Sequence, residues 1–479
     1  MGKVSATWII RIVACTCLIL TGCSTYRHEP YRADEKTSVE ARDYALHFIE
    51  ADDEGWFWDP SQADRALELV EAKVAERNTI VVVFIHGWHH SAQCCDDDVE
   101  GFKETLIRLK RQLAAPAHEA MQTTRTSSAR DINVVGIYLG WRGRSLPGFF
   151  NYFTFWGRKA SAERVGNTDF GEFLARLNGL YLRHNDRRLN EASTREQRAA
   201  GHFLGLVTIG HSFGAQVLIK AVGATLEEQL IRNNPRPGYL RTGQTTAAPH
   251  DTQPIVGVGD LLVLLNPATE AAQYHRLHLL SRSLRYPKVQ APIMLTVSAR
   301  NDVPRHRLFT FGRVLGEIFT GKPRKADAVE REVERKALGV YPPHITHRLV
   351  AVDPSSRLVP TRIDHEREPG CPGTGTCECD FLEWQAPPEL TEPDSITARS
   401  ANRLNAFDFS GELTFSNVKL VPESNAIAYQ PLIVAEADAS VIDGHNGIFT
   451  APFLEFLVSY IAFVETKHAQ LRHERQSLP

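Results

Sequence analysis

The run Thr79–Ile85, with the sequence TIVVVFI, constrains the fold more than any other segment of the chain. A strand with one face in water alternates apolar and polar residues, whereas this run is almost continuously apolar and β-branched. Such a run predicts a strand that is buried on both faces, which is typical of parallel sheets covered by helices on both sides. The sequence therefore favours an α/β fold.

Strand-like and helix-like segments alternate along much of the chain from about residue 43 onward. Further strands are predicted at 44–49, 132–139, 203–209, 261–265, 293–298 and 432–437. Helices are predicted at 61–77, 99–113, 159–183, 213–232 and 452–466. This order predicts a mostly parallel central sheet flanked by helices.

The alternation is lost between residues 310 and 424. This region contains a charged helical segment at 324–338, strand-like segments at 346–352 and 412–421, and a loop rich in Pro, Gly and Cys between them. We interpret 310–424 as a large insertion before the last strand, which could form a cap. The core is then assigned to residues 43–309 and 425–479.

The sequence GHSFG at Gly210–Gly214 stands between a predicted strand and a predicted helix. A nucleophile on a tight strand-to-helix turn has a strained backbone, so the flanking positions must be small. The turn also places the hydroxyl at a helix N-terminus, where backbone N–H groups can stabilise an oxyanion. Ser212 is therefore the candidate nucleophile.

Three further short motifs follow predicted strands: HGW at His86–Trp88, ARND at Ala299–Asp302 and DGHNG at Asp443–Gly447. Together with GHSFG they resemble the α/β-hydrolase superfamily, and in particular its esterases and lipases. The order of elements matches over about 43–309 and 425–479. The resemblance implies an α/β-hydrolase fold.

By this resemblance, the backbone N–H groups of Trp88 and Phe213 form the oxyanion hole. The acid lies between the serine and the histidine in the chain. Asp302 is the best candidate, because a loop that follows a strand projects to the edge of the sheet where ligands bind. Glu270, shortly after the strand 261–265, is the alternative. Asp260 precedes that strand and is expected at the opposite edge.

His445 is the best candidate for the base among the 19 histidines. It lies in a loop between the predicted last strand and the closing helix, with glycines nearby on both sides. Such a loop can present an imidazole without crowding. His344 and His347, at the edge of the insertion, are the alternatives. The histidines of the HGW turn and its next residues are predicted to pack the turn.

The resemblance implies hydrolysis of carboxylic esters through an acyl-serine intermediate, without a cofactor. The substrate would be a small-molecule or lipid ester. Acyl transfer or amide hydrolysis on the same three residues is a second interpretation, since an acyl-enzyme does not fix the acceptor. A third is a non-catalytic envelope lipoprotein that uses an inert hydrolase fold for binding.

The N-terminus reads as an export signal. Lys3 and Arg11 precede the apolar run 12–20, which is too short to span a bilayer as a helix but suits a signal peptide. The run ends in LTGC at Leu20–Cys23, which resembles a bacterial lipobox. This predicts a signal peptide at 1–22, a lipid anchor on Cys23 and a polar tether at 23–42. Ser24 resembles the pattern for sorting to the outer membrane, so we expect a lipid-anchored protein of the cell envelope, facing the periplasm.

Charge and cysteine content exclude some functions. The net charge of −3 offers no electrostatic basis for binding nucleic acid. After the signal and Cys23, the remaining cysteines are odd in number: Cys94, Cys95, Cys371, Cys377 and Cys379. We favour disulfides among the last three. No cysteine and histidine spacing matches a zinc site, so no metal is predicted.

Aromatic residues are concentrated at 149–156, after the predicted strand 132–139. They could line an acyl pocket or contact lipid, or they could pack a helix onto the sheet. The sequence leaves these alternatives open.

Overall fold

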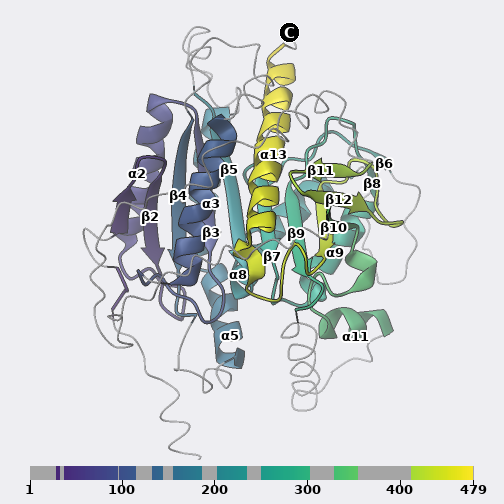
Figure 1. Ribbon diagram of the computed structural model, residues 1–479, viewed down its shortest axis with the longest axis horizontal. Helices are drawn as coiled ribbons and strands as arrows, with labels where there is room; N and C mark the ends of the chain where they lie inside the picture. The colour runs from purple at the N-terminus through teal and green to yellow at the C-terminus, as the bar shows by residue number, and fades with distance from the viewer. Residues whose placement is uncertain are drawn as a thin grey trace, which may run out of the picture.

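The computed structural model describes residues 29–32, 37–94, 96–114, 132–143, 155–185, 202–234, 250–302, 328–353 and 411–477, the last nine by their backbone alone. Figure 1 shows a central sheet with helices in front of it and behind it. The predicted α/β class with a mostly parallel sheet is confirmed.

The main sheet has 11 strands in the order β1-β2-β4-β3-β5-β7-β9-β13-β10-β12-β11. From β2 to β10 every neighbouring pair is parallel, and the outer pairs are antiparallel. The bounds of these strands are β1 Ser38–Glu40, β2 Ala45–Glu50, β4 Asn133–Gly140, β3 Thr79–Ile85, β5 Leu204–His211, β7 Leu261–Leu265, β9 Met294–Ala299, β13 Leu432–Ala437, β10 His347–Ala351, β12 Val418–Pro422 and β11 Leu413–Phe415. A second, two-stranded sheet pairs β6 (His250–Asp251) with β8 (Leu284–Arg285).

Both faces of the main sheet are covered, as the apolar run of β3 predicts. Every residue of β3 is buried. Its side chains alternate between two apolar cores, with Val81 and Val83 in one and Val82 and Phe84 in the other. The first core holds α2 (Pro60–Glu76), α5 (Phe155–Gly166), α6 (Asp169–Asn185), α8 (Phe213–Arg232) and α9 (Ala271–Arg282). The second holds α3 (Asp97–Ala114) and α13 (Ala451–Ser477).

The helical stretch predicted at 159–183 is confirmed, and it consists of two helices, α5 and α6, separated at residues 167–168. The break follows Gly166, where α5 approaches α8 so closely that a Cβ on this glycine would lie 2.5 Å from the carbonyl oxygen of Val217. The last turn tightens there, because the N–H of Asn167 donates to the carbonyl of Arg164 at 2.9 Å, three residues back. A periodic apolar pattern does not reveal such a backbone contact.

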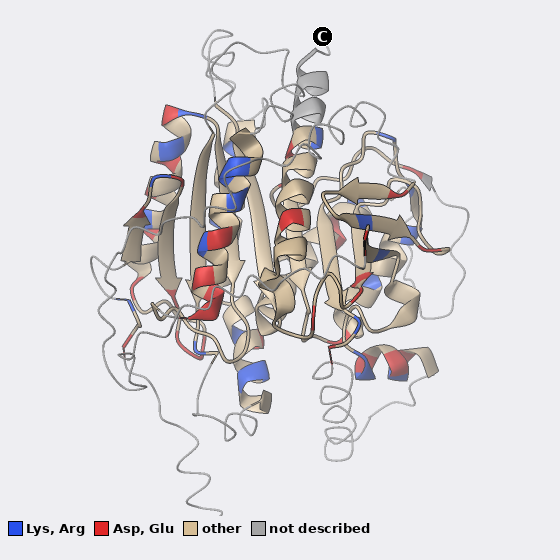
Figure 2. Ribbon diagram, viewed as in Figure 1, with Lys and Arg blue, Asp and Glu red and all other residues tan. Residues whose placement is uncertain are grey.

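The described part of the insertion 310–424 does not form a separate cap. Strands β10, β12 and β11 extend the main sheet beyond β13, and Leu349, Val418 and Leu420 are buried in the second core. This covers the backbone edge that β13 would otherwise expose. The predicted charged helix corresponds to α11 (Ala328–Arg335), which is densely charged in Figure 2 and packs against α9. Residues 303–327 and 354–410 lie outside the described residues.

The boundary between tether and core also differs from the prediction. Strand β1 pairs with β2, so the folded domain begins before residue 43. The backbone N–H groups of Tyr31 and Arg32 donate to the carboxylate of Glu50. The signal peptide at 1–22 and Cys23 lie outside the described residues. Within the described ranges, no helix is both long and apolar enough to cross a membrane.

Candidate active site

The turn that carries Ser212 joins β5 directly to α8. The backbone of Ser212 has φ 55° and ψ −115°, a region that side-chain-bearing residues rarely adopt. A Cβ on Gly210 would lie 2.6 Å from the carbonyl oxygen of Gly214, and a Cβ on Gly214 would collide with the carbonyl oxygen of Ile85. Both glycines are therefore required by close backbone contacts, as the motif predicts.

The structure brings Ser212, His445 and Asp302 together. The Ser212 hydroxyl lies 2.8 Å from Nε2 of His445, and Nδ1 of His445 lies 2.6 Å from a carboxylate oxygen of Asp302. Since a carboxylate only accepts, Nδ1 carries the proton and Nε2 accepts the hydrogen bond of the serine hydroxyl. Ser212 and Asp302 are buried, whereas 20% of the His445 side chain is exposed.

These three residues meet because their strands are parallel and lie close together in the sheet. Ser212 follows β5, Asp302 follows β9 and His445 follows β13, and only β7 lies between β5 and β9. The carboxyl ends of parallel strands lie at one edge of the sheet, here called the carboxyl edge. It is the lower edge in Figure 1, where α13 begins.

The turn after β3 lies directly against the serine. A Cβ on Gly87 would be 2.8 Å from the Cβ of Ser212. Trp88 is the next residue in this turn, and Phe213 is the first residue of α8. The N–H groups of a first helical turn have no acceptor within the helix, and they lie at the positive end of its dipole. The predicted oxyanion donors therefore flank the serine.

The two other carboxylates considered for the acid, Asp260 and Glu270, bind other groups. Asp260 accepts hydrogen bonds from the hydroxyl of Tyr181 at 2.7 Å and the N–H of Leu206 at 2.9 Å, just ahead of β7. This places it at the opposite edge, as expected. The carboxylate of Glu270 forms a buried ion pair with Lys159 at 3.0 Å. Neither carboxylate is hydrogen-bonded to His445 in the described contacts.

The alternative bases lie among other groups. Nε2 of His344 contacts Nδ1 of His275 at 2.9 Å, and burial holds the pKa of His344 well below its usual value. His347 contacts the Thr346 hydroxyl at 2.9 Å, and burial lowers its pKa to about 4. No described hydrogen bond joins either residue to Ser212.

The histidines of the HGW turn pack it, as predicted. Burial lowers the pKa of His86, so this imidazole is neutral. Its Nδ1–H donates to the carbonyl of Gly87 at 2.9 Å, and its Nε2 accepts from the N–H of Trp141 at 2.9 Å. These two bonds tie the turn after β3 to the end of β4. His89 has a positive φ of 76° within the same turn.

A buried network of charged side chains contacts the HGW turn. His90 contacts Asp96 at 2.8 Å and Asp98 at 3.5 Å. Burial opposes the charge on His90, but the carboxylates of Asp98 and Asp96 outweigh it and raise the pKa of His90 to about 9. Asp98 also accepts from the N–H of Gly87 at 3.4 Å and lies 3.5 Å from Nδ1 of His211. The other ring nitrogen of His211 lies 3.2 Å from the carbonyl oxygen of His445.

Asn266 is a site residue that the sequence analysis missed. It is fully buried directly after β7 with φ 42°. Its Nδ2 donates to the carbonyls of His445 at 2.7 Å and Gly444 at 3.2 Å, and its Oδ1 accepts from the N–H of Ala299 at 2.8 Å. It therefore joins the loop of the predicted base to the strand that precedes the predicted acid. The one sequence feature that could have identified Asn266 as a site residue is its position directly after a predicted strand.

Asn301 holds the same loop from the other side. Its Nδ2 donates to the carboxylate of Asp443 at 2.7 Å, and its Oδ1 accepts from the N–H of Gly444 at 2.9 Å. Asn301 is part of the ARND motif and Asp443 of the DGHNG motif. The two loops therefore bind each other through residues other than the predicted acid and base.

Part of the aromatic stretch at 149–156 lies beside the predicted oxyanion turn. The Phe155 ring is 5.2 Å from Trp88 and 5.1 Å from Phe213, measured between ring centroids. Phe155 begins α5, which packs against α8, so its ring lies between helix and turn. The preceding aromatics, Phe149, Phe150, Tyr152 and Phe153, lie outside the described residues.

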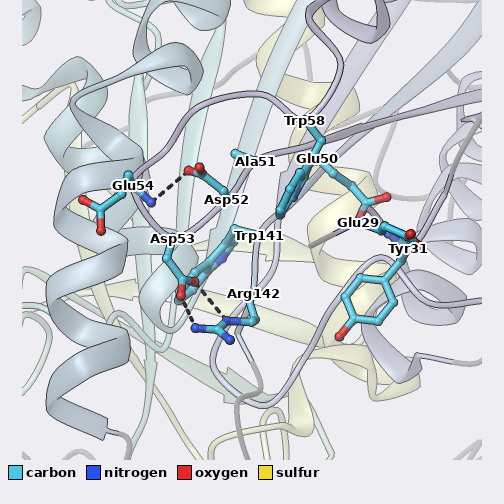
Figure 3. A pocket seen from close by; sticks show the side chains of 10 residues that line it. All are labelled: Glu29, Tyr31, Glu50, Ala51, Asp52, Asp53, Glu54, Trp58, Trp141 and Arg142. Atoms are coloured by element: carbon cyan, nitrogen blue, oxygen red, sulfur yellow. Dashed lines mark hydrogen bonds and ion pairs between the residues drawn. The ribbon is translucent and has the colours of Figure 1, made fainter. Parts of the chain in front are cut away.

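A pocket of about 140 Å³ opens at the same edge, beyond β2 and β4. None of the predicted site residues lines it. Figure 3 shows Asp53 paired with Arg142 among the lining side chains, and Asp53 also pairs with Arg158 at 2.5 Å. These guanidinium groups outweigh the effect of burial and lower the pKa of Asp53. The other acidic lining residues are Glu29, Glu50, Asp52 and Glu54.

The described residues contain no cluster of three or more His, Cys, Asp or Glu side chains that could hold a metal ion. Cys94 is disulfide-bonded, whereas Cys95, Cys371, Cys377 and Cys379 lie outside the described residues. In comparisons with known proteins, the chain matches no protein-family model, no curated protein and no solved structure.

Proposed function

We propose that the protein is a serine hydrolase that cleaves carboxylic esters through an acyl-serine intermediate. The observation that carries this proposal is the continuous hydrogen-bond chain from the Ser212 hydroxyl through His445 to Asp302. A serine hydroxyl is a weak nucleophile unless a base removes its proton, and an imidazole needs a carboxylate to hold it in the correct tautomer. The site needs no cofactor for this chemistry.

In the proposed reaction, Nε2 of His445 takes the Ser212 proton as the oxygen attacks the ester carbonyl. The negative charge that develops on the carbonyl oxygen is stabilised by the N–H groups of Trp88 and Phe213. Collapse of this intermediate releases the alcohol, which receives its proton from His445, and leaves the acyl-serine. Water, activated by the same histidine, then releases the acid and restores the serine.

We also propose the α/β-hydrolase fold for the core. Three features support it: the strained serine turn between β5 and α8, the glycine turn after β3 packed against that serine, and the chain order Ser212, Asp302, His445. Acyl transfer and amide hydrolysis use the same three groups and are outcomes of the test below.

For location, we propose a bacterial lipoprotein anchored through Cys23 in the outer membrane and facing the periplasm. The LTGC motif after a short apolar run supports this. Metabolic labelling with an alkyne fatty acid should modify the wild type and leave Cys23→Ala unlabelled.

A fluorophosphonate probe tests the nucleophile. The wild type and Ser281→Ala should label, while Ser212→Ala should not. Ser281 is a matched control because it is also a buried serine, and its hydroxyl donates to the carbonyl of His278. A folded wild type that never labels would refute the proposal and favour a binding protein on an inert fold.

Turnover of p-nitrophenyl esters tests the remaining assignments. His445→Ala should abolish turnover, while His347→Ala should retain it; the reverse result would overturn the choice of base. A competing alcohol separates hydrolysis from acyl transfer, because a transferase forms the new ester in preference to the free acid. An amide substrate cleaved faster than its ester would favour the amidase alternative.

A further inference from the structure

The start of the described chain is fixed at the carboxyl edge of the sheet. The N–H groups of Tyr31 and Arg32 donate to the carboxylate of Glu50 at 2.8 and 2.6 Å, at the end of β2. The Arg32 side chain is buried, and its Nε donates to the carbonyl of Ala92 at 2.7 Å, in the loop after β3. The segment that leads to Cys23 therefore leaves the domain at the edge where Ser212 lies.

The length of this segment limits where a lipid on Cys23 can be. Cys23 precedes Tyr31 by eight residues (31 − 23), which span at most about 29 Å when fully extended. The eight residues of β5 alone span about 26 Å from one edge of the sheet to the other. A segment running back along the domain would have to be almost fully stretched to bring the lipid to the opposite edge, so in all other conformations the lipid lies closer to the carboxyl edge.

Exposed apolar side chains are concentrated at the same edge. Four large apolar residues of the described chain are exposed: Trp56 (61%), Val352 (46%), Trp156 (45%) and Val289 (37%). Trp56 follows β2, Val352 follows β10, and Trp156 lies in the first turn of α5 beside Phe155. Only Val289 lies at the opposite edge, ahead of β9. Tryptophan is the residue most suited to the boundary between lipid and water.

We propose that the carboxyl edge docks on the bilayer that carries the Cys23 lipid, with Trp56 and Trp156 entering its interface. The Ser212 site then faces the membrane, and its ester substrate is a lipid of that bilayer. This inference rests on the proposed function and on the proposed anchor. A bilayer is the occupant because the anchor holds this edge within reach of one.

The carboxyl edge carries charges of both signs. Glu29, Asp52 and Glu54 line the pocket at the end of β2 (Figure 3), whereas Arg142 lines the same pocket and Arg164 pairs with Glu54. Arg300, directly after β9, is 63% exposed at the same edge. The edge therefore has no single-sign charge that would select anionic headgroups, and zwitterionic lipids such as phosphatidylethanolamine are a suitable probe of docking.

Quenching of tryptophan fluorescence by bromine-labelled lipid tails tests docking. The mature, lipidated protein is reconstituted into vesicles of phosphatidylethanolamine and brominated phosphatidylcholine. We expect quenching in the wild type, its loss in Trp56→Ser/Trp156→Ser, and its retention in Val289→Ser. Quenching that is absent in the wild type, or unchanged in the double variant, would overturn the proposal. Equal urea unfolding curves show that the variants are folded.

Ser212→Ala separates this inference from the proposed function, since it should dock and be quenched like the wild type even if no ester is cleaved. In the active protein, the double variant should hydrolyse vesicle phospholipid at least about tenfold more slowly, because each half-exposed indole loses its burial in the interface. Its turnover of water-soluble p-nitrophenyl butyrate should be unchanged. Equal hydrolysis of vesicle lipid by both proteins would mean that the membrane is not the source of the substrate.

Discussion

Replacing Asn266 with alanine should slow the proposed reaction without touching any of the three groups proposed to react. The amide holds the carbonyls of His445 and Gly444 on one side and the N–H of Ala299 on the other. Without it, the loop that carries the imidazole keeps the contact of His211 with the His445 carbonyl and the bonds to Asn301. The loop should therefore shift rather than unfold.

The magnitudes follow from these contacts. Three hydrogen bonds between neutral groups contribute about 1 kcal/mol each, so the free energy of unfolding should fall by about 3 kcal/mol. Alanine at φ 42° adds strain of about 1 kcal/mol, which glycine avoids. A displacement of a reacting group by about 1 Å costs on the order of 100-fold in rate. We therefore expect kcat to fall 10- to 100-fold. The KM should be nearly unchanged, because Asn266 is fully buried and does not contact the substrate.

The assay measures kcat and KM on p-nitrophenyl butyrate, together with urea unfolding, for Asn266→Ala and Asn266→Gly. Both variants lack the amide, so both should lose the same factor in kcat, while the glycine variant is the more stable by up to about 1 kcal/mol. Asn185→Ala is the control, because its Nδ2 also donates to a backbone carbonyl, that of Leu204 at 2.6 Å, but at the opposite edge. Wild-type kcat in Asn266→Gly would refute the reasoning, since the backbone alone would then position the loop.

Three further predictions concern the surroundings of the site. The pKa of His90 is raised from 6.5 to about 9, so the stability that its charge contributes is fully present below pH 6.5 and is lost as the pH rises through 9. Over this range the free energy of unfolding should fall by about 3 kcal/mol in the wild type and should not fall in His90→Gln, as measured by urea unfolding at each pH. Glu270→Gln leaves Lys159 with only the half-exposed carboxylate of Glu163 and should destabilise by about 1.5–3 kcal/mol, yet turnover per folded molecule should persist. Asp302→Asn should instead lose about 10⁴-fold in turnover, and a folded, inactive Glu270→Gln would transfer the role of acid to Glu270. Gly214→Ala forces a Cβ against the carbonyl oxygen of Ile85, so the melting temperature and the rate of fluorophosphonate labelling should both fall, and an unchanged labelling rate would contradict the close contact.

The strands and the serine turn were predictable from the sequence because their signals are local. A continuous β-branched run such as Thr79–Ile85 suits only a strand covered on both faces, and the structure buries all of it. The flanking glycines of the GHSFG turn are required because a Cβ on Gly210 would collide with Gly214 and a Cβ on Gly214 would collide with Ile85, next to the HGW turn. Parallel pairing then places the ends of β5, β9 and β13 at one edge, which is why Ser212, Asp302 and His445 could be named together.

Other features depended on contacts between distant segments, and only the tertiary structure determined them. The glycine at 166 is required by the approach of α8, and the segment 310–424 extends the sheet because β10 pairs with β13. Asn266 is an ordinary loop residue in the sequence, yet its partners lie 33 and 179 positions away. The sequence by itself determined which side chains could react, because residue type and local turn geometry decide that. The tertiary structure determined which groups hold them in place and which edge of the sheet the start of the described chain shares with them, because those depend on which strands become neighbours.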